Sequence, residues 1–152
     1  MFKHIVMKES EKLIVGALEC CDLPDLDLFN VQMRVDTGAA TSSLHVDNIE
    51  EFEKDGKRWV NFDIHPDVHN VDTAVNKTLL LKGKKVVKSS SADKEKRFVI
   101  KTAIRLGGQS WPIKLTLTDR SSMKNLMLLG REAMEGHILV DPGQEFLVSE
   151  ED

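Results

Sequence analysis

Apolar and polar residues alternate along much of this chain, and a period of two predicts β-strands rather than helices. The stretch 59–64 is the clearest example, because Val, Phe and Ile alternate there with Asn and Asp. With the apolar run 126–129, the pattern predicts strands at 13–18, 31–35, 41–45, 59–64, 98–106, 111–117, 126–129 and 138–140. Gly107-Gly108-Gln109-Ser110 separates two of these strands and predicts a β-hairpin. We therefore predict an all-β fold.

The remaining segments carry weaker patterns. One short helix is predicted at 131–135, closed by Gly136, and the polar run 48–54 fits a single helical turn. Few large side chains occur in the first part of segment 66–97, which holds several charges and a run of serines. Two interpretations stay open for it, an extended flap over a cleft or a plain surface insertion. We expect one domain over residues 1–152, with frayed ends at 1–10 and 147–152.

Composition and charge limit the classes of partner and the cellular setting that we expect for this protein. The formal net charge is −4 and charges of both signs are interspersed, so no basic footprint for nucleic acid is evident. No apolar stretch is long enough for a signal peptide or a membrane span. Cys20 and Cys21 are adjacent, a poor geometry for a disulfide and the wrong spacing for a zinc knuckle. These features predict a reduced, cytoplasmic protein without a membrane partner.

The candidate chemistry lies in Asp36-Thr37-Gly38, which follows a β-branched residue and precedes two alanines. Aspartic proteolysis needs two such carboxylates that share one proton, but the sequence holds one copy of the motif. We therefore expect a homodimer in which each protomer supplies one Asp36. The same tripeptide also suits an ordinary loop, where Asp bonds its own backbone and Gly takes a positive φ.

A second element follows near the C-terminus. Four consecutive apolar residues, 126–129, indicate a strand that is buried on both faces. Gly130 comes next, and a glycine at that place allows close approach to another backbone segment. The two elements in this order point to an acid-protease lobe.

At this point the chain resembles a known family over residues 15 to 146. It is similar to the RimB-type, retropepsin-like proteins that carry the name ATP-dependent zinc protease and accompany ATP-grasp glutamate ligases. The residues that carry the resemblance are Arg34-Val35-Asp36-Thr37-Gly38-Ala39-Ala40-Thr41-Ser42-Ser43-Leu44-His45, Lys88-Ser89-Ser90-Ser91 with Arg97, Asp119-Arg120-Ser121-Ser122-Met123, Leu128-Leu129-Gly130-Arg131 and Val140-Asp141-Pro142. The resemblance implies a closed acid-protease barrel with one short helix near the C-terminus, and a functional link to a glutamate ligase.

The resemblance also implies roles for individual residues. Asp36 would act as general base and acid, Thr37 would brace the two turns across the dimer axis, and Gly38 would let the substrate backbone approach. Ala39 would fill the space beside the turn. Leu128, Leu129 and Gly130 would pack under the turn. The candidates for binding substrate carboxylates are Arg34, Arg120 and Arg131, each of which could instead belong to a structural ion pair.

One departure from the retroviral pattern concerns Arg131. In retroviral proteases this Arg pairs with an Asp at the end of the Asp-Thr-Gly-Ala-Asp motif. The corresponding residue here is Ala40, so the resemblance leaves Arg131 without its usual partner. A guanidinium near the cleft suits a carboxylate, and this favours a glutamate-rich tail as the substrate. Arg131 could also be structural, paired with Glu132 or Asp119.

Metal and nucleotide chemistry receive little support from the sequence. His65 and His69 are four residues apart, but Pro66 opposes a helix there, and no Glu follows the first His as in a zinc protease motif. His45 and His137 lie elsewhere, so we expect no metal and no cofactor. No Gly-rich phosphate loop is present, so ATP hydrolysis is unsupported. A non-catalytic module that binds acidic peptides and a zinc-dependent protease remain the alternatives to an aspartic peptidase.

Overall fold

The fold is built almost entirely from strands. A computed structural model of the chain describes residues 11–65, 74–88, 94–119 and 125–150. The elements are β1 (Leu13–Val15), β2 (Leu18–Leu23), the 3₁₀ turn η2 (Pro24–Leu26), β3 (Leu28–Asp36), β4 (Ser42–Lys54), β5 (Lys57–Ile64), β6 (Val75–Leu80), β7 (Gly83–Lys88), β8 (Lys94–Leu106), β9 (Gln109–Asp119), β10 (Met127–Gly130), α1 (Arg131–Met134) and β11 (Ile138–Val140). The predicted all-β class and the short C-terminal helix are confirmed.

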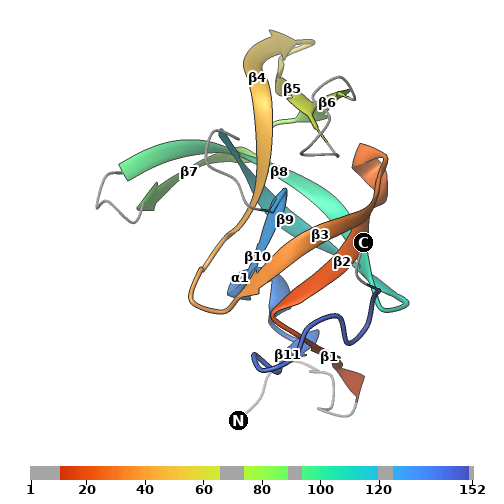
Figure 1. The fold of residues 1–152 in the computed structure, drawn as a ribbon. Coiled ribbons are helices and arrows are strands. Elements are labelled where there is room, and N and C mark those ends of the chain that lie inside the picture. Colours follow the sequence, from red (N-terminus) through yellow and green to blue (C-terminus); the bar gives the residue numbers. More distant parts are fainter. Residues whose placement is uncertain (1–10, 66–73, 89–93, 120–124, 151–152) are drawn as a thin grey trace.

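The strands of the main sheet follow the order β10-β3-β2-β8-β9-β4-β5-β6, and β7 pairs with β8 (Figure 1). β10 lies parallel to β3 and also pairs antiparallel with β4, so it is inserted between the two strands that flank the Asp turn. The predicted closed barrel is wrong in one respect. β5 and β6 continue beyond β4, and no other strand of the described residues pairs with the outer edge of β6, so the sheet as a whole does not close.

The core follows the alternation of the sequence. Ile100, Thr102, Ile104 and Leu106 of β8 are buried, whereas Lys101 and Arg105 between them are exposed. The same alternation holds in the other central strands, because successive side chains of a strand point to opposite faces of the sheet. The largest fully buried side chains are Phe62, Leu23, Leu26, Leu28, Met33, Leu44, Ile64, Ile100, Ile104, Leu106, Leu115 and Leu117.

The predicted hairpin is confirmed. β8 and β9 are joined by Gly107 and Gly108, which have φ of 55° and 81°. Positive φ at both central residues is the requirement of a type I′ turn, and it explains the paired glycines. This turn sets the register in which Ile104 lies opposite Trp111 and Lys101 opposite Lys114.

The prediction of one strand over 13–18 is wrong, because the strand breaks at Gly16. β1 pairs with β11, whereas β2 pairs with β3 and β8. Between them the chain passes so close to the C-terminal segment that a Cβ on Gly16 would lie 2.4 Å from the carbonyl oxygen of Gln144. Only glycine permits this crossing.

The helical turn predicted at 48–54 is also wrong. This segment continues β4 and pairs with β5 after a bulge, where Asn48 takes φ of 53° and donates its side-chain amide to Asp63. Segment 66–97 holds β6, β7 and the start of β8, which the sequence did not predict. Its parts 66–73 and 89–93 lie outside the described residues.

The prediction of a frayed end at 147–152 is wrong for residues 147–149, which are held by hydrogen bonds. Glu19 is completely buried, and its carboxylate accepts hydrogen bonds from the backbone N–H groups of Leu147 and Val148 and from the Ser149 hydroxyl. The Gly16 N–H adds a fourth bond at 2.8 Å. A buried carboxylate is tolerated only when it is paired or hydrogen-bonded, and here the C-terminal segment supplies most of the donors. Residues 1–10 and 151–152 lie outside the described residues.

Candidate functional site

The Asp36-Thr37-Gly38 turn lies at the exposed end of β3. Asp36 is half-buried, and its Oδ1 accepts the Gly38 N–H at 2.9 Å. The Ala39 N–H returns to the Asp36 carbonyl oxygen at 3.2 Å and closes the turn. Gly38 does not take a positive φ, unlike the glycine of the ordinary loop considered above. A Cβ at Gly38 would lie 3.2 Å from Asp36 Oδ1, so this glycine leaves room for the carboxylate.

β10 lies beside the strand that leads into the turn, with Gly130 opposite Asp36. Leu129 and Gly130 are buried, and Leu128 is half-buried. A Cβ on Gly130 would lie 2.5 Å from the carbonyl carbon of Thr41, and the Gly130 N–H donates to Ser42 Oγ at 3.0 Å. The close contact of β10 with the segment that leaves the turn is therefore possible only with glycine at position 130.

Arg131 directly follows Gly130 and donates hydrogen bonds to the Asp turn. Its backbone N–H donates to the Ala39 carbonyl oxygen at 2.8 Å. Its side-chain Nη1 donates to the carbonyl oxygens of Thr37 and Gly38 at 3.4 and 3.3 Å. Glu132 instead bonds Lys85 at 3.4 Å. The Arg131 guanidinium thus donates to backbone carbonyls of the Asp turn. It has no carboxylate partner at position 40, because that residue is Ala40.

A hairpin arm reaches out above the turn. We call β7 together with residues 94–98 of β8 the arm; it projects to the left of the body in Figure 1. Between the arm and the turn lies a hollow of about 490 Å³, which we call the turn hollow. Gly38 and Ala39 form part of its wall. The cationic side chains that line it are Lys85, Lys88 and Arg97, beside His45.

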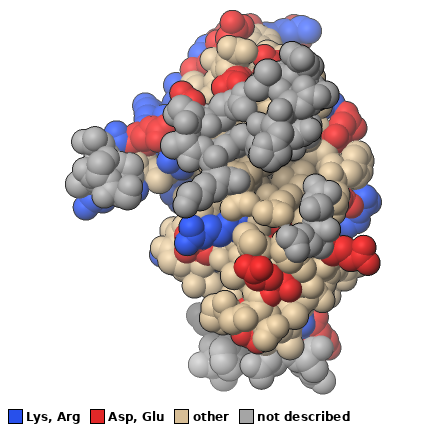
Figure 2. All heavy atoms as spheres, viewed as in Figure 1, with Lys and Arg blue, Asp and Glu red and all other residues tan. Residues whose placement is uncertain are grey.

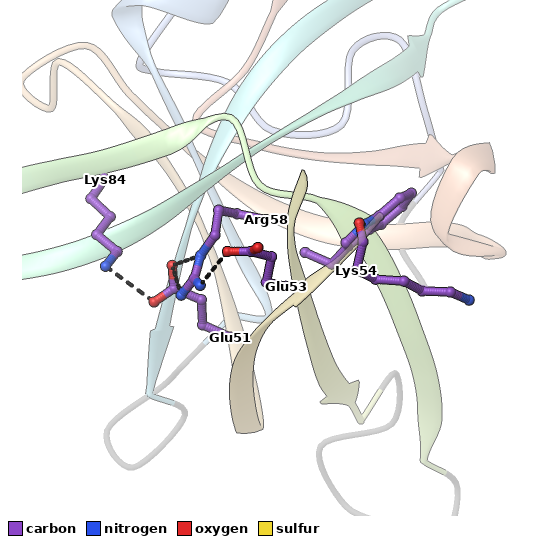
Figure 3. A network of polar contacts seen from close by, with 6 residues as sticks. Glu51, Glu53, Lys54, Arg58 and Lys84 are labelled. Carbon is purple, nitrogen blue, oxygen red and sulfur yellow. Dashed lines mark hydrogen bonds and ion pairs between the residues drawn. The ribbon is translucent and has the colours of Figure 1, made fainter. Parts of the chain in front are cut away.

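The arm is attached to the body by a charged network (Figure 3). Lys84 of β7 bonds Glu51 of β4 at 3.1 Å, and Arg58 of β5 bonds the same carboxylate at 3.0 Å. These bonds, that of Lys84 first, hold the pKa of the Glu51 carboxyl below its ordinary value. Lys84 also lies over the Phe98 ring at 5.4 Å.

Arg34 lies on β3 two residues before Asp36, is exposed, and lies opposite Leu128 of β10. No hydrogen bond or ion pair of its guanidinium is found within the described ranges. Arg120 lies outside the described residues. Thr37 is exposed on the turn.

The histidines do not converge on one point. His65 Nε2 lies 3.0 Å from Asp47 Oδ2, and its buried Nδ1 has no hydrogen-bond partner among the described residues. His45 Nδ1 contacts the Asp119 carbonyl oxygen at 3.1 Å, and His137 stacks on Trp111. His69 lies outside the described residues. Within the described part of the chain, no three His, Cys, Asp or Glu side chains are placed to hold a metal ion, so these residues do not fit a zinc centre.

The two cysteines are buried and form no disulfide within the described residues. Burial raises the pKa of the Cys21 thiol well above its ordinary range, and its Sγ contacts the Met127 sulfur at 3.8 Å. A thiol held in its neutral form is a poor nucleophile, so Cys21 serves packing. No helix in the described ranges is long and apolar enough to span a membrane.

No site role was predicted for the basic residues of the arm, although Lys88 and Arg97 belong to the family resemblance. Lys85 and Arg97 lie directly opposite each other in the register of β7 and β8, and both line the turn hollow. Segment 83–88 has adjacent lysines and adjacent valines, so its sequence shows no period of two that would predict β7. The pairing with β8, which brings the two cations together, is not visible in either strand alone.

Several known proteins are similar to this chain. Residues 14–151 match the RimB-like family, described as "Retropepsin-like aspartic endopeptidase RimB". Two relatives named "Probable alpha-L-glutamate ligase" come from Parasynechococcus marenigrum (strain WH8102), 46% identical over 133 residues, and from Shewanella pealeana (strain ATCC 700345 / ANG-SQ1), 42% identical over 139 residues. The matches cover 88% and 91% of this chain but 28% and 30% of the relatives, so the chain spans less than a third of their length.

A solved structure is similar as well. The crystal structure of a protein of unknown function from Legionella pneumophila subsp. pneumophila str. Philadelphia 1 superposes with a TM-score of 0.72 at 32% identity. The match covers 89% of this chain and 97% of that chain. The family match spans the Asp turn, the β10 strand beneath it and the short helix, and the chain therefore belongs to the RimB-like family of retropepsin-like aspartic endopeptidases.

Proposed function

We propose that this protein is an aspartic endopeptidase that acts as a homodimer, with one Asp36 from each protomer. The observation that carries the proposal is the Asp turn itself. An exposed turn holds the Asp36 carboxylate through the Gly38 N–H, above a buried strand and next to an open hollow. Because each chain has one such motif and its turn is accessible, a second protomer can bring the second carboxylate to the first.

The chemistry follows from two carboxylates that share one proton. Two adjacent carboxyl groups cannot both ionise, so one keeps its proton. The ionised Asp36 takes a proton from water while the water oxygen bonds to the peptide carbonyl carbon, and the protonated Asp36 donates its proton to the carbonyl oxygen. The C–N bond of the tetrahedral diol then breaks. The amine takes the proton that the first Asp36 received, and one hydroxyl of the diol returns its proton to the second.

Acidic polypeptides are the substrates that we propose, in particular glutamate-rich tails. The turn hollow is lined by Lys85, Lys88 and Arg97, so it favours carboxylates. The relatives whose name is glutamate ligase support the same proposal, since a peptidase beside a glutamate ligase would hydrolyse the kind of chain that the ligase makes. A non-catalytic acidic-peptide module would share these cations but would not need Asp36.

The first test compares two matched variants on a glutamate-rich peptide. Asp141 bonds the Gly143 N–H at 3.1 Å, in the same arrangement in which Asp36 bonds Gly38. We expect Asp36→Asn to abolish hydrolysis and to keep the melting temperature, because an amide cannot take the proton of water. Asp141→Asn should leave hydrolysis unchanged. Residual hydrolysis by Asp36→Asn would contradict the aspartic mechanism, and hydrolysis that chelators remove and zinc restores would replace it with a metal mechanism.

The second test addresses the dimer. Increasing amounts of inactive Asp36→Asn chain are mixed with a fixed amount of wild-type chain. Hydrolysis per wild-type chain should fall, because each mixed dimer lacks one of the two carboxylates. Hydrolysis that stays constant per wild-type chain, together with a monomeric sedimentation profile, would refute the shared site.

A further inference from the structure

A second and larger hollow lies beside the turn hollow. It has a volume of about 840 Å³, and we call it the lysine groove. Five lysines and two glutamates are among the residues that line it, on β7 and the residue before it, on β8 and β9, and on the segment around α1. Thr41 and Lys85 line both hollows, so the lysine groove continues directly from the turn hollow.

Two of the five lysines are directly opposed. Lys101 of β8 and Lys114 of β9 form a cross-strand pair, and both are exposed on the face opposite the core. Like charges in such a pair destabilise a sheet. Other opposed lysines, Lys54 with Lys57 and Lys88 with Lys94, lie at hairpin ends, where side chains can diverge into solvent. The Lys101–Lys114 pair instead lies in the middle of both strands, at the wall of the groove.

The groove keeps unneutralised positive charge. Lys84 is bound to Glu51, and Lys85 to Glu132 on the rim. Within the described ranges, Lys82, Lys101 and Lys114 make no hydrogen bond or ion pair through their ammonium groups. The chain as a whole carries a net charge of −4, so the five lysines of the groove contrast with the overall charge of the protein. In Figure 2, lysines and arginines are visible around the arm at the left, with acidic residues next to them, and others lie at the top and at the right edge.

We propose that the lysine groove is an accessory binding site for the acidic stretch that flanks the cleaved bond, and that Lys101 and Lys114 determine the preference for long acidic chains. The inference rests on the proposed function, because it places the cleaved bond at the Asp turn. A peptide in the turn hollow that continues past Lys85 enters the lysine groove. Carboxylates at successive positions of that peptide would neutralise the opposed lysines, which fits an acidic polypeptide better than a single small anion.

The volume of the groove and the contacts of its floor are those of a ligand site. Its volume lies within the range of about 300–1,000 Å³ that is usual for ligand sites. Its floor is rigid, because Trp111 stacks on His137 with ring centroids 4.4 Å apart and donates its indole N–H to the Ala133 carbonyl oxygen at 2.9 Å. The floor is therefore formed before any ligand binds.

The test measures binding rather than hydrolysis, so that it does not depend on the catalytic mechanism. Fluorescently labelled poly-L-glutamate of about ten residues, which spans about 33 Å when extended, and tri-glutamate are titrated onto full-length Asp36→Asn protein. In this background, Lys101→Gln with Lys114→Gln should weaken binding of the long peptide by about fivefold or more, since two exposed ion pairs are lost. The loss for tri-glutamate should be clearly smaller.

The control is Lys54→Gln with Lys57→Gln in the same background. It removes the same two charges from another directly opposed pair, which lines neither hollow. We expect unchanged affinity for both peptides. The Lys101 and Lys114 double variant should also keep or raise the melting temperature, because it removes a like-charge contact. A lower melting temperature would instead mark the two lysines as structural.

Three results would overturn the proposal. The first is equal affinity of the Lys101 and Lys114 double variant and its parent for the long peptide. The second is an equal loss in the Lys54 and Lys57 control, which would mean that only net charge matters. The third is binding of an RNA oligonucleotide that needs Lys101 and Lys114 while poly-glutamate does not bind. None of these results bears on whether Asp36 cleaves peptides.

Discussion

Gly130→Ala tests whether the site depends on the close contact between β10 and the segment that leaves the Asp turn. The new Cβ would lie 2.5, 2.6 and 2.9 Å from the carbonyl carbon, oxygen and nitrogen of Thr41. Non-bonded carbon atoms are most stable at about 3.5–4.0 Å, so the two backbone segments must separate by about 1 Å. All three contacts are with backbone, so no side-chain rotation can relieve them.

Separating the two backbone segments lowers the free energy of unfolding through two effects. Overpacking in a core costs about 1–3 kcal/mol. The buried bond from the Gly130 N–H to Ser42 Oγ, 3.0 Å long, would be stretched or broken, which costs about 1–3 kcal/mol more. A free energy of unfolding reduced by about 2–6 kcal/mol corresponds to a melting temperature lower by about 5–20 °C for a chain of this size. Hydrolysis should fall as well, because the Arg131 N–H that fixes the Ala39 carbonyl oxygen moves with β10.

The assay is urea unfolding followed by tryptophan fluorescence, with calorimetry for the melting temperature. Gly143→Ala is the matched control. Its Cβ would lie 3.5 Å from Asp141 Oδ1, an ordinary contact, and Gly143 has no positive φ. We expect the control to change the free energy of unfolding by less than about 1 kcal/mol. If Gly130→Ala unfolds at the same urea concentration as Gly143→Ala, the argument from close backbone contact is refuted.

Three further predictions concern polar contacts. Glu19→Ala should lower the free energy of unfolding by about 3 kcal/mol or more, because four donors lose a buried carboxylate; an unchanged urea midpoint with intact C-terminal protease resistance would contradict this. The lowered pKa of Glu51 means that its bonds to Lys84 and Arg58 stabilise the fold above the ordinary pKa of a glutamate and lose this effect as pH falls through the lowered value. Glu51→Gln should therefore reduce the acid-induced loss of stability in a pH series of melting temperatures, and an unchanged pH profile would contradict this. Arg131→Gln should reduce hydrolysis of glutamate-rich and neutral peptides by similar factors, because Arg131 binds carbonyls of the Asp turn; a selective loss on acidic peptides would favour a direct contact with substrate.

The sequence alone determined the features that depend on local spacing. Asp36-Thr37-Gly38 and Gly130 could be found because a turn and a close backbone contact restrict the residue type at single positions. The β8–β9 hairpin and the helix closed by Gly136 were predictable for the same reason, since Gly107, Gly108 and Gly136 all take positive φ. The alternation of 98–106 and 111–117 identified the buried faces of two strands, because side chains of a strand alternate between core and solvent.

Only the tertiary structure decided which distant residues meet. Glu19 has the sequence character of an exposed residue, yet it is buried because residues 147–149 bring their donors to it. Arg131 found its partners in backbone carbonyls, which no side-chain pattern reveals. In the sequence pattern, Lys101 and Lys114 are each typical of a strand residue that faces solvent. The register of β8 and β9 brings these two charges together, and the fold places them beside the groove, because strand pairing depends on contacts that each strand's own pattern does not contain.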